Sequence, residues 1–216
     1  MTVVALTGGI AAGKSTVSEF LAAEGAKLIY ADELARKAVE AGSKGLEKVV
    51  NRFGGEFLTS TGELDRSSLA KTIFNDPKAR EDLNKIVHPI VRLLFAAAVD
   101  KAKQDHPDRV LVYEIPLLVE TSARENFDLV VVVHAPAQIR AQRLVVERGL
   151  SPVEAEARIN AQSSDEDRLA VADLTINAAV DPAVTREGAL ELYQGLADHW
   201  PGPFQFRSKH LPSIGS

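Results

Sequence analysis

The sequence predicts an α/β fold in which a parallel β-sheet is wrapped by helices. Five short apolar runs are separated by helical patterns. The runs are continuous rather than alternating in polarity, as expected of strands covered on both faces. The chain has 216 residues, of which 45% are hydrophobic and 25% charged. At about 150 residues per domain, this fits one domain, or one with a sizeable insertion, and a chain that buries a substantial core.

The first expected strand, residues 3–6, is stopped by Thr7-Gly8-Gly9 and leads into a helix over about residues 14–23,. Further apolar runs predict four more strands and one final helix. The strands are expected at residues 27–30, 110–115, 129–134 and 174–176, and the helix at residues 182–199.

A helical insertion is predicted between the second and third strands. The connection over residues 32–107 is far longer than one crossover requires and contains several helix-like stretches without a strand,. Asp76-Pro77 is typical of a helix start, because Pro suits the first turn and the acidic side chain can cap free amides. The apolar-periodic stretch 83–99 supplies a packed face, which His88-Pro89 is expected to interrupt.

The remaining chain, residues 1–31 and 108–199, is predicted to form the core around the sheet. Within it, residues 141–169 are rich in Arg and Glu and lie between the fourth and fifth strands, so they are a candidate for a mobile lid. Residues 200–216 carry enough Pro, Gly and Ser to be a loosely held tail,. We interpret the single Trp, Trp200, as a packing contact.

Composition excludes several function classes. The chain carries 25 Lys+Arg against 30 Asp+Glu, a net charge of −5, which argues against a basic face for nucleic acid. It has no Cys, which removes disulfides, thiolate zinc sites and a Cys nucleophile. The N-terminus reads neither as a signal peptide nor as a membrane span,. We therefore expect a cytoplasmic protein with no nucleic-acid or membrane partner.

A phosphate-binding loop is the strongest motif in the sequence. Residues 8–16 read GGIAAGKST and match the P-loop pattern G-x-x-x-x-G-K-[ST]. Glycines let backbone amides approach phosphate oxygens, and the dipole of the following helix favours an anion. We expect Lys14 on the β- and γ-phosphates of ATP, Ser15 on Mg²⁺ and Thr16 beside the α-phosphate. The expected ATP-binding residues of the loop are Gly8, Gly9, Ala11, Ala12, Gly13, Lys14, Ser15 and Thr16.

The loop alone does not separate GTPase switches, ATPase motors and small-molecule kinases. No Asp has a Gly three places on, and the only Asn-Lys pair, Asn84-Lys85, is not followed by an Asp two residues later. Guanine specificity is therefore poorly supported, and the length leaves little room for the extra domains of most motors. A kinase of a small acceptor is the leading class. A nucleoside or sugar kinase and a nucleotide-dependent binding module are the alternatives.

Two carboxylates follow predicted strands, where open α/β folds bind their ligands. Asp32 follows the second strand and could orient an acceptor hydroxyl or take its proton,. The alternative is that it caps a helix. Glu114 ends the third strand, where an acidic residue can approach Mg²⁺ through water. The alternative for Glu114 is a structural hydrogen bond to the loop.

Five arginines fall in and around the predicted lid, where guanidinium groups could close over the transferring phosphate. They are Arg140, Arg143, Arg148, Arg158 and Arg168. Arg143 and Arg148 are the best placed, one to two turns after the fourth strand. Taken alone, His88 in its apolar helix is best explained as a packing residue.

An ordered set of motifs runs along nearly the whole chain. It comprises TGGIAAGKST near the start, ADELAR at 31–36, GELDRSSLAKTIFNDP at 62–77, IVHPIV at 86–91, EIPLLVE at 114–120, RLVVERGLS at 143–151, INAQ at 159–162 and RLAVADLTINAA at 168–179. With these motifs the chain resembles the dephospho-coenzyme A kinase family. The phosphate loop is shared by many proteins, but the ordered set is specific.

The resemblance implies transfer of the ATP γ-phosphate to the ribose 3′-hydroxyl of dephospho-CoA, the last step of CoA synthesis. It implies a P-loop NTPase-like core with a five-stranded parallel sheet flanked by helices, a helical CoA-binding insertion and a lid. Catalysis would fall to Lys14, Asp32 and Arg143. The resemblance also places Asn177 near the adenine of ATP, and His88, Leu117 and Leu118 at the acceptor with Asp32. From its place after the fourth strand, Arg148 is a further expected ATP-binding residue. Ser15 and, through water, Glu114 would hold Mg²⁺. We expect a monomer or a weak homo-oligomer.

Three positions depart from the family pattern. Ala11-Ala12 replaces the usual Gly-Ser, so the loop lacks a permissive glycine and a hydroxyl. Tyr30 replaces an Asp that often precedes Asp32. The segment 163–167 is more acidic than the common pattern, which weakens the case for a phosphate contact there.

Overall fold

The structure is a computed structural model that describes residues 3–74, 76–121 and 123–200. The chain folds into two compact units. The first comprises the chain up to Ile29 and from Ala102 onward, and the second comprises Tyr30–Lys101. No helix in the described ranges is both long and apolar enough to cross a membrane.

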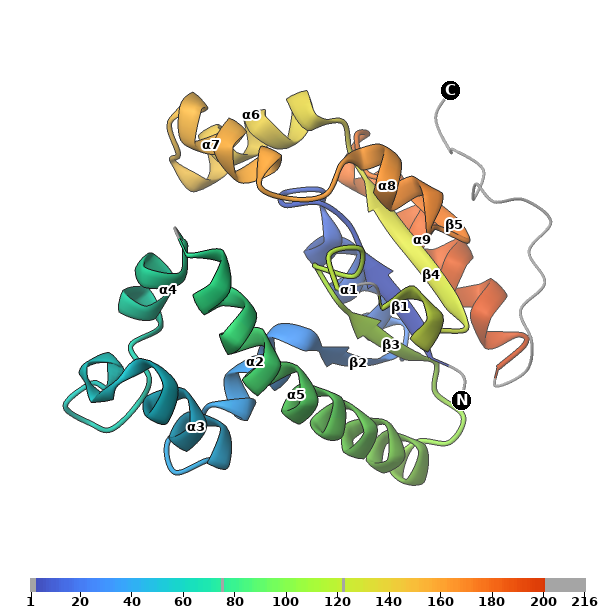
Figure 1. Cartoon of the computed structure of the whole chain (residues 1–216). Helices are drawn as coiled ribbons and strands as arrows, with labels where there is room; N and C mark the ends of the chain where they lie inside the picture. The colour runs from blue at the N-terminus through green and yellow to red at the C-terminus, as the bar shows by residue number, and fades with distance from the viewer. Residues whose placement is uncertain (1–2, 75, 122, 201–216) are drawn as a thin grey trace. The chain divides into compact units, whose positions relative to one another are not determined.

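A five-stranded sheet forms the centre of the first unit, in the order β2-β3-β1-β4-β5 (Figure 1). Its strands are β1 (Val4–Thr7), β2 (Lys27–Tyr30), β3 (Leu111–Glu114), β4 (Leu129–His134) and β5 (Leu174–Asn177). The central strand β1 pairs in parallel with β3 and β4, and β4 pairs in parallel with β5. The predicted fold class is confirmed, and each strand lies within one residue of its predicted position at either end.

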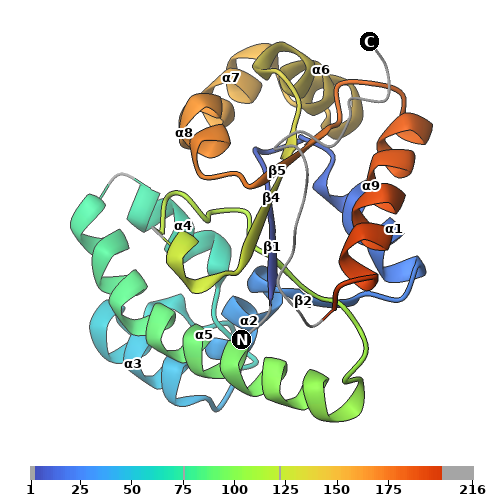
Figure 2. The same cartoon turned by 90° about the vertical axis from the view of Figure 1, so that its right-hand side faces the viewer.

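Two helices, α1 (Lys14–Ala23) and α9 (Pro182–Ala197), lie side by side over the sheet (Figure 2). Their apolar residues, such as Leu21 and Leu192, share one buried core with Leu6 and Val131 of the sheet. Trp200 packs against this core, as the sequence predicts. The predicted tail after Trp200 lies outside the described residues.

Three helices connect β4 to β5, namely α6 (Ala137–Arg148), α7 (Pro152–Asn160) and α8 (Asp165–Ala170). Both α7 and α8 begin with a capping box, formed by Ser151 with Glu154 and by Ser164 with Asp167. Each box satisfies two amides at the helix start, which fixes where the helix begins. The acidic segment 163–167 thus has a local structural role at Asp167.

The second unit is built from α2 (Ala31–Ala38), α3 (Lys44–Phe53), the 3₁₀ turn η1 (Gly55–Phe57), α4 (Arg66–Phe74) and most of α5 (Pro77–Asp105). Its core contains Val39, Leu46, Val49, Phe57 and Leu69. Gly45 lets α3 approach α2 closely, because a Cβ there would lie 1.8 Å from the carbonyl oxygen of Ala38. In the described part of this unit, β-pairing is limited to an isolated bridge between Leu58 and Leu64.

Helix α5 runs unbroken through Pro89, so the predicted interruption at His88-Pro89 is wrong. Proline removes an amide donor and crowds the preceding turn. On one side of Pro89, Ile86 and Val87 pack on the core of the second unit, and further along the helix Val99 is fully buried. Packing of the helix therefore overrides the local preference of Pro89. The predicted helix start is correct, because Asp76 Oδ1 accepts a hydrogen bond from Ala79 N at 2.9 Å.

Replacing Pro89 by Ala should raise the free energy of unfolding by about 2 kcal/mol, because it restores a helical amide and removes the ring clash. Thermal unfolding followed by circular dichroism measures the change. The matched control is Pro77→Ala, because Pro77 occupies the first helical position, where its ring is favourable,. If Pro89→Ala were no more stable than Pro77→Ala, Pro89 would not destabilise the helix.

Candidate active site

The loop between β1 and α1 is shaped by close contact with β4. A Cβ on Gly8 would lie 2.3 Å from the carbonyl oxygen of Val133, so only glycine allows this approach. The N-cap of α1 is Gly13, whose φ is 99° and which supplies no side-chain acceptor,. The amides at the start of α1 therefore lack a side-chain cap, which suits a bound anion.

Ala11 adopts a left-handed backbone conformation, with φ 58°. For a residue with a Cβ this costs about 1–2 kcal/mol. Among the described residues it is the one non-glycine residue with positive φ. At the position of Ala11, the family that this chain resembles usually has glycine.

The Lys14 side chain folds across the start of the loop. Its Nζ donates to the carbonyl oxygen of Gly8 at 2.8 Å and to that of Gly9 at 3.4 Å. Ser15 is exposed and Thr16 is half-buried in the first turn of α1. The loop's charged residue and its two hydroxyls thus surround one helix N-terminus.

Glu114 lies at the end of β3, beside β1, where it pairs in register with Leu6. Its Oε2 accepts a hydrogen bond from the buried hydroxyl of Ser18 on α1. Ser15 and Ser18 are three residues apart and share a helix face. The carboxylate is therefore held next to the face that carries Ser15. The sequence offered two roles for Glu114, a magnesium contact through water and a structural hydrogen bond to the loop. The structure shows a structural hydrogen bond, but its donor is Ser18 on α1 and not the loop.

Arg140 is one of two arginines that the structure places against the loop, the other being Arg143. It is only 2% exposed, and its Nε and Nη2 donate to Ala135 O at 2.9 Å and to Asp165 Oδ1 at 2.7 Å. Its Nη1 is buried without a hydrogen-bond partner. A Cβ on Gly9 would lie 2.6 Å from Nη1. An unpartnered cationic donor beside a phosphate loop fits an anionic ligand.

Arg143 ties the loop to the segment after β5. Its Nη1 donates to Ala11 O at 3.2 Å and its Nη2 to Ala178 O at 2.6 Å. Arg148 is exposed at the end of α6, and Arg158 is exposed on α7. Arginine spacing along the sequence favoured Arg143 and Arg148, and only burial reveals Arg140.

Asn177 ends β5, and its side chain is exposed. Its Oδ1 accepts a hydrogen bond from Ala179 N at 2.9 Å, which fixes the turn after the strand. Of the two leucines predicted at the acceptor, Leu118 is fully buried, whereas Leu117 is 46% exposed. Leu117 is therefore the one of the pair that offers its side chain to a ligand.

The second unit carries Asp32 and His88. Asp32 is exposed in the first turn of α2, and the N-cap of that helix is Tyr30. The alternative prediction that Asp32 caps the helix is therefore wrong. His88 is half-buried on α5, and burial, with a smaller contribution from Arg92, lowers its pKa below the ordinary value of 6.5. The lowered pKa favours the neutral imidazole of His88.

The parallel sheet order, the glycine loop and the helix that follows it define a P-loop nucleoside-triphosphate-binding fold. A family model described as dephospho-CoA kinase matches residues 2–181. The chain belongs to the dephospho-CoA kinase family. A dephospho-CoA kinase of Leifsonia xyli is 44% identical over 196 residues, which make up 91% of this chain and 99% of that relative.

A dephospho-CoA kinase of Mycobacterium leprae is 43% identical over 196 residues, with 89% of this chain and 46% of the relative covered, so the chain spans about half of that protein. Among solved structures, a dephospho-CoA kinase from Campylobacter jejuni aligns with a TM-score of 0.70 and 29% identity, covering 91% of this chain and 97% of the other. A shikimate kinase from Acinetobacter baumannii shares the fold alone, with a TM-score of 0.52, 18% identity, and 90% and 92% of the two chains covered.

Replacing Ala11 by Gly should stabilise the protein by about 1 kcal/mol, because glycine adopts the left-handed conformation without the Cβ clash. In a chain of this size that raises the melting temperature by about 2–4 °C. The matched control is Ala12→Gly, since Ala12 is 1% exposed and glycine there only loses packing and gains unfolded-state entropy,. Equal destabilisation of both variants would show that Ala11 is unstrained.

Proposed function

We propose that this chain transfers the γ-phosphate of ATP to the ribose 3′-hydroxyl of dephospho-CoA and so forms coenzyme A. The observation that carries the proposal is the family match over residues 2–181, which includes the phosphate loop and continues through both units. Shared folds host many reactions. The family match is therefore what supports this acceptor over others.

The loop residues fit the triphosphate of ATP. The amides at the start of α1, the Lys14 ammonium and the unpartnered Nη1 of Arg140 provide positive groups around one short segment. Phosphoryl transfer needs little more from a protein than positioning and charge stabilisation. In this proposal Lys14 and Arg140 hold the phosphate oxygens, and Arg143, which also donates to the Ala11 carbonyl, stabilises the transferring phosphate.

Mg²⁺ would be held by the Ser15 hydroxyl and, through water, by Glu114, and would neutralise charge on the phosphates. Hard oxygen ligands of this kind suit Mg²⁺, which keeps several of its waters. Ser18 orients the carboxylate by its hydrogen bond to Oε2. Between residues 3 and 200, leaving out 75 and 122, no group of three or more His, Cys, Asp or Glu side chains is arranged to hold a metal ion.

On the acceptor side we assign Asp32 as the carboxylate that orients the ribose hydroxyl and takes its proton. Its exposed position in the first turn of α2 leaves it accessible to a substrate. We place Leu117 and the neutral imidazole of His88 in contact with the acceptor. Arg148 and Asn177, both exposed, are proposed nucleotide contacts.

The proposed setting is the cytoplasm, with dephospho-CoA as the small-molecule partner and no nucleic-acid or membrane partner. The net charge of −5 supports a locally cationic site on an acidic protein rather than a polyanion-binding face,. We expect the protein to work as a monomer or a weak homo-oligomer.

ADP formation should depend on dephospho-CoA. We expect Mg-ATP turnover to rise strongly with dephospho-CoA, to stay at background with adenosine and with a sugar panel, and to yield a product one phosphate heavier by mass spectrometry. A response to adenosine or to a sugar instead would identify another small-molecule kinase. The same ATP turnover with and without every acceptor would point to a nucleotide-dependent switch.

Asp32→Asn should lower kcat by about 100- to 10,000-fold, because the variant keeps the shape but loses the proton acceptor. The KM of Asp32→Asn for ATP should stay nearly unchanged. Lys14→Ala, by contrast, should lower kcat and weaken ATP binding as well. Glu33→Gln is the matched control, since the same neutralisation is made one residue away at an exposed site. Near-normal kcat in Asp32→Asn would remove this carboxylate from the chemistry.

A further inference from the structure

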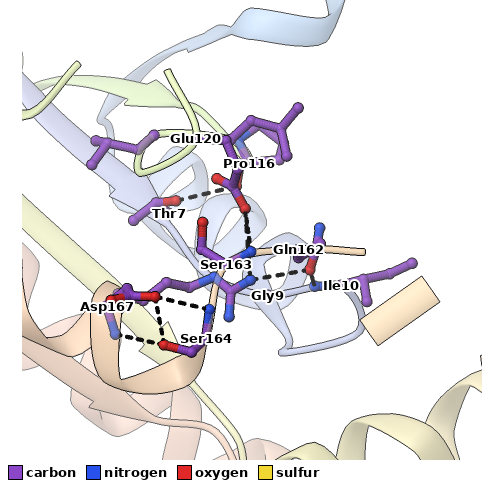
Figure 3. A network of polar contacts seen from close by, with 12 residues as sticks. Thr7, Gly9, Ile10, Pro116, Glu120, Gln162, Ser163, Ser164 and Asp167 are labelled. Atoms are coloured by element: carbon purple, nitrogen blue, oxygen red, sulfur yellow. Dashed lines mark hydrogen bonds and ion pairs between the residues drawn. The ribbon is translucent and has the colours of Figure 1, made fainter. Parts of the chain in front are cut away.

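The segment between α7 and α8 is hydrogen-bonded to the phosphate loop (Figure 3). The side-chain oxygen Oε1 of Gln162 accepts a hydrogen bond from Ile10 N at 2.8 Å. The same oxygen accepts from Arg168 Nη2 at 3.4 Å. A neutral side chain from the predicted lid region thus binds the backbone of the loop.

A second contact anchors this segment on its other side. Ser163 N donates to Glu120 Oε1 at 2.9 Å, and that oxygen lies 3.9 Å from Arg168 Nη2. Arg168 is only 3% exposed, and its Nη1 donates to Asp165 Oδ1 at 3.0 Å. The buried guanidinium therefore fixes both Gln162 and Glu120.

The geometry of one peptide group explains what the Gln162 contact does. The N–H of Ile10 and the carbonyl of Gly9 belong to the same planar trans peptide and point in opposite directions. Gln162 holds the N–H side. On the other side, the Gly9 oxygen accepts from Ala12 N at 3.1 Å and from Lys14 Nζ at 3.4 Å. Fixing one side of this peptide therefore fixes where the loop turns and where Lys14 lies.

We propose that Gln162 is a positioning residue of the nucleotide site, which acts through the Gly9–Ile10 peptide on the loop and on Lys14. The proposal rests on the proposed function only in taking this loop as the ATP site. Arg168 orients the Gln162 amide, and Glu120 holds the adjacent backbone. The segment thereby pre-organises the loop, so that binding energy is not spent on ordering it.

The test compares Gln162→Met, which keeps length but loses the acceptor, with Gln162→Glu, which keeps an acceptor oxygen. Gln142→Met is the matched control, because it makes the same change at an exposed position of α6. Mg-ATP affinity is measured by calorimetry, exchange of the Ile10 amide by hydrogen–deuterium NMR, and KM for ATP and for dephospho-CoA by steady-state kinetics.

We expect Gln162→Met to weaken Mg-ATP binding about five- to tenfold, as loss of one hydrogen bond predicts, and to speed exchange at Ile10. The KM for the acceptor should change less than the KM for ATP. Gln162→Glu should keep Ile10 protected, and Gln142→Met should match the wild type. Wild-type ATP affinity in Gln162→Met, or an unprotected Ile10 in Gln162→Glu, would overturn the proposal.

These readouts separate the role of Gln162 from the identity of the acceptor. Nucleotide affinity and Ile10 exchange are both measured without dephospho-CoA. If the wild-type protein phosphorylated a different acceptor, the proposed function would be wrong. The role of Gln162 would still be tested independently by nucleotide affinity and Ile10 exchange.

Discussion

The packing of the glycine loop on β4 is the constraint on which the rest of the site depends. Gly8 approaches the Val133 carbonyl so closely that any side chain there would collide with backbone. This contact fixes how the chain leaves β1 and therefore where α1 begins. Lys14, Ser15 and Ser18 are all carried by that helix. The positions of Lys14 and Ser15, a proposed phosphate ligand and a proposed metal ligand, thus follow from one backbone contact between the loop and β4.

The site keeps two unfavourable features that a purely structural loop would not need. Ala11 stands in a left-handed conformation, and Arg140 Nη1 is buried without a hydrogen-bond partner. A buried unsatisfied donor costs about 1–3 kcal/mol. Both features lie at the loop, and a second buried unpartnered donor among the described residues, Arg168 Nε, belongs to the guanidinium that contacts Gln162. Strain and unmet hydrogen bonds gather where a ligand can relieve them, which supports an anion at this position.

Local patterns in the sequence were enough to predict the sheet and the loop. Each strand is a continuous apolar run, and the loop motif carries its own spacing, so both can be found without knowing distant contacts. The continuity of α5 could not be predicted in this way. Proline at position 89 is a local signal to stop, and the packing that overrides it comes from residues of other helices.

The polar contacts around the loop were also beyond prediction. Arg140 and Gln162 resemble their exposed neighbours in composition, and they acquire roles only because the fold brings them to residues far away in sequence. Gln162 and Ile10, for example, are 152 positions apart. Burial is the signal that separates Arg140 and Arg168 from Arg148 and Arg158. No periodicity within the lid region encodes that difference.

The charges of the side chains around the phosphate loop suit an anionic ligand. Asp165 is linked to the loop through Arg140, and two guanidinium groups, those of Arg140 and Arg168, share its Oδ1. These two guanidinium groups neutralise the negative charge of Asp165, which would otherwise repel a phosphate. Gln162, which touches the loop itself, accepts through a neutral amide. A carboxylate there would hold the same N–H but would add an opposing field at short range in a partly buried site. The network thus supplies an acceptor to the loop backbone and leaves the unpartnered Nη1 of Arg140 beside Gly9.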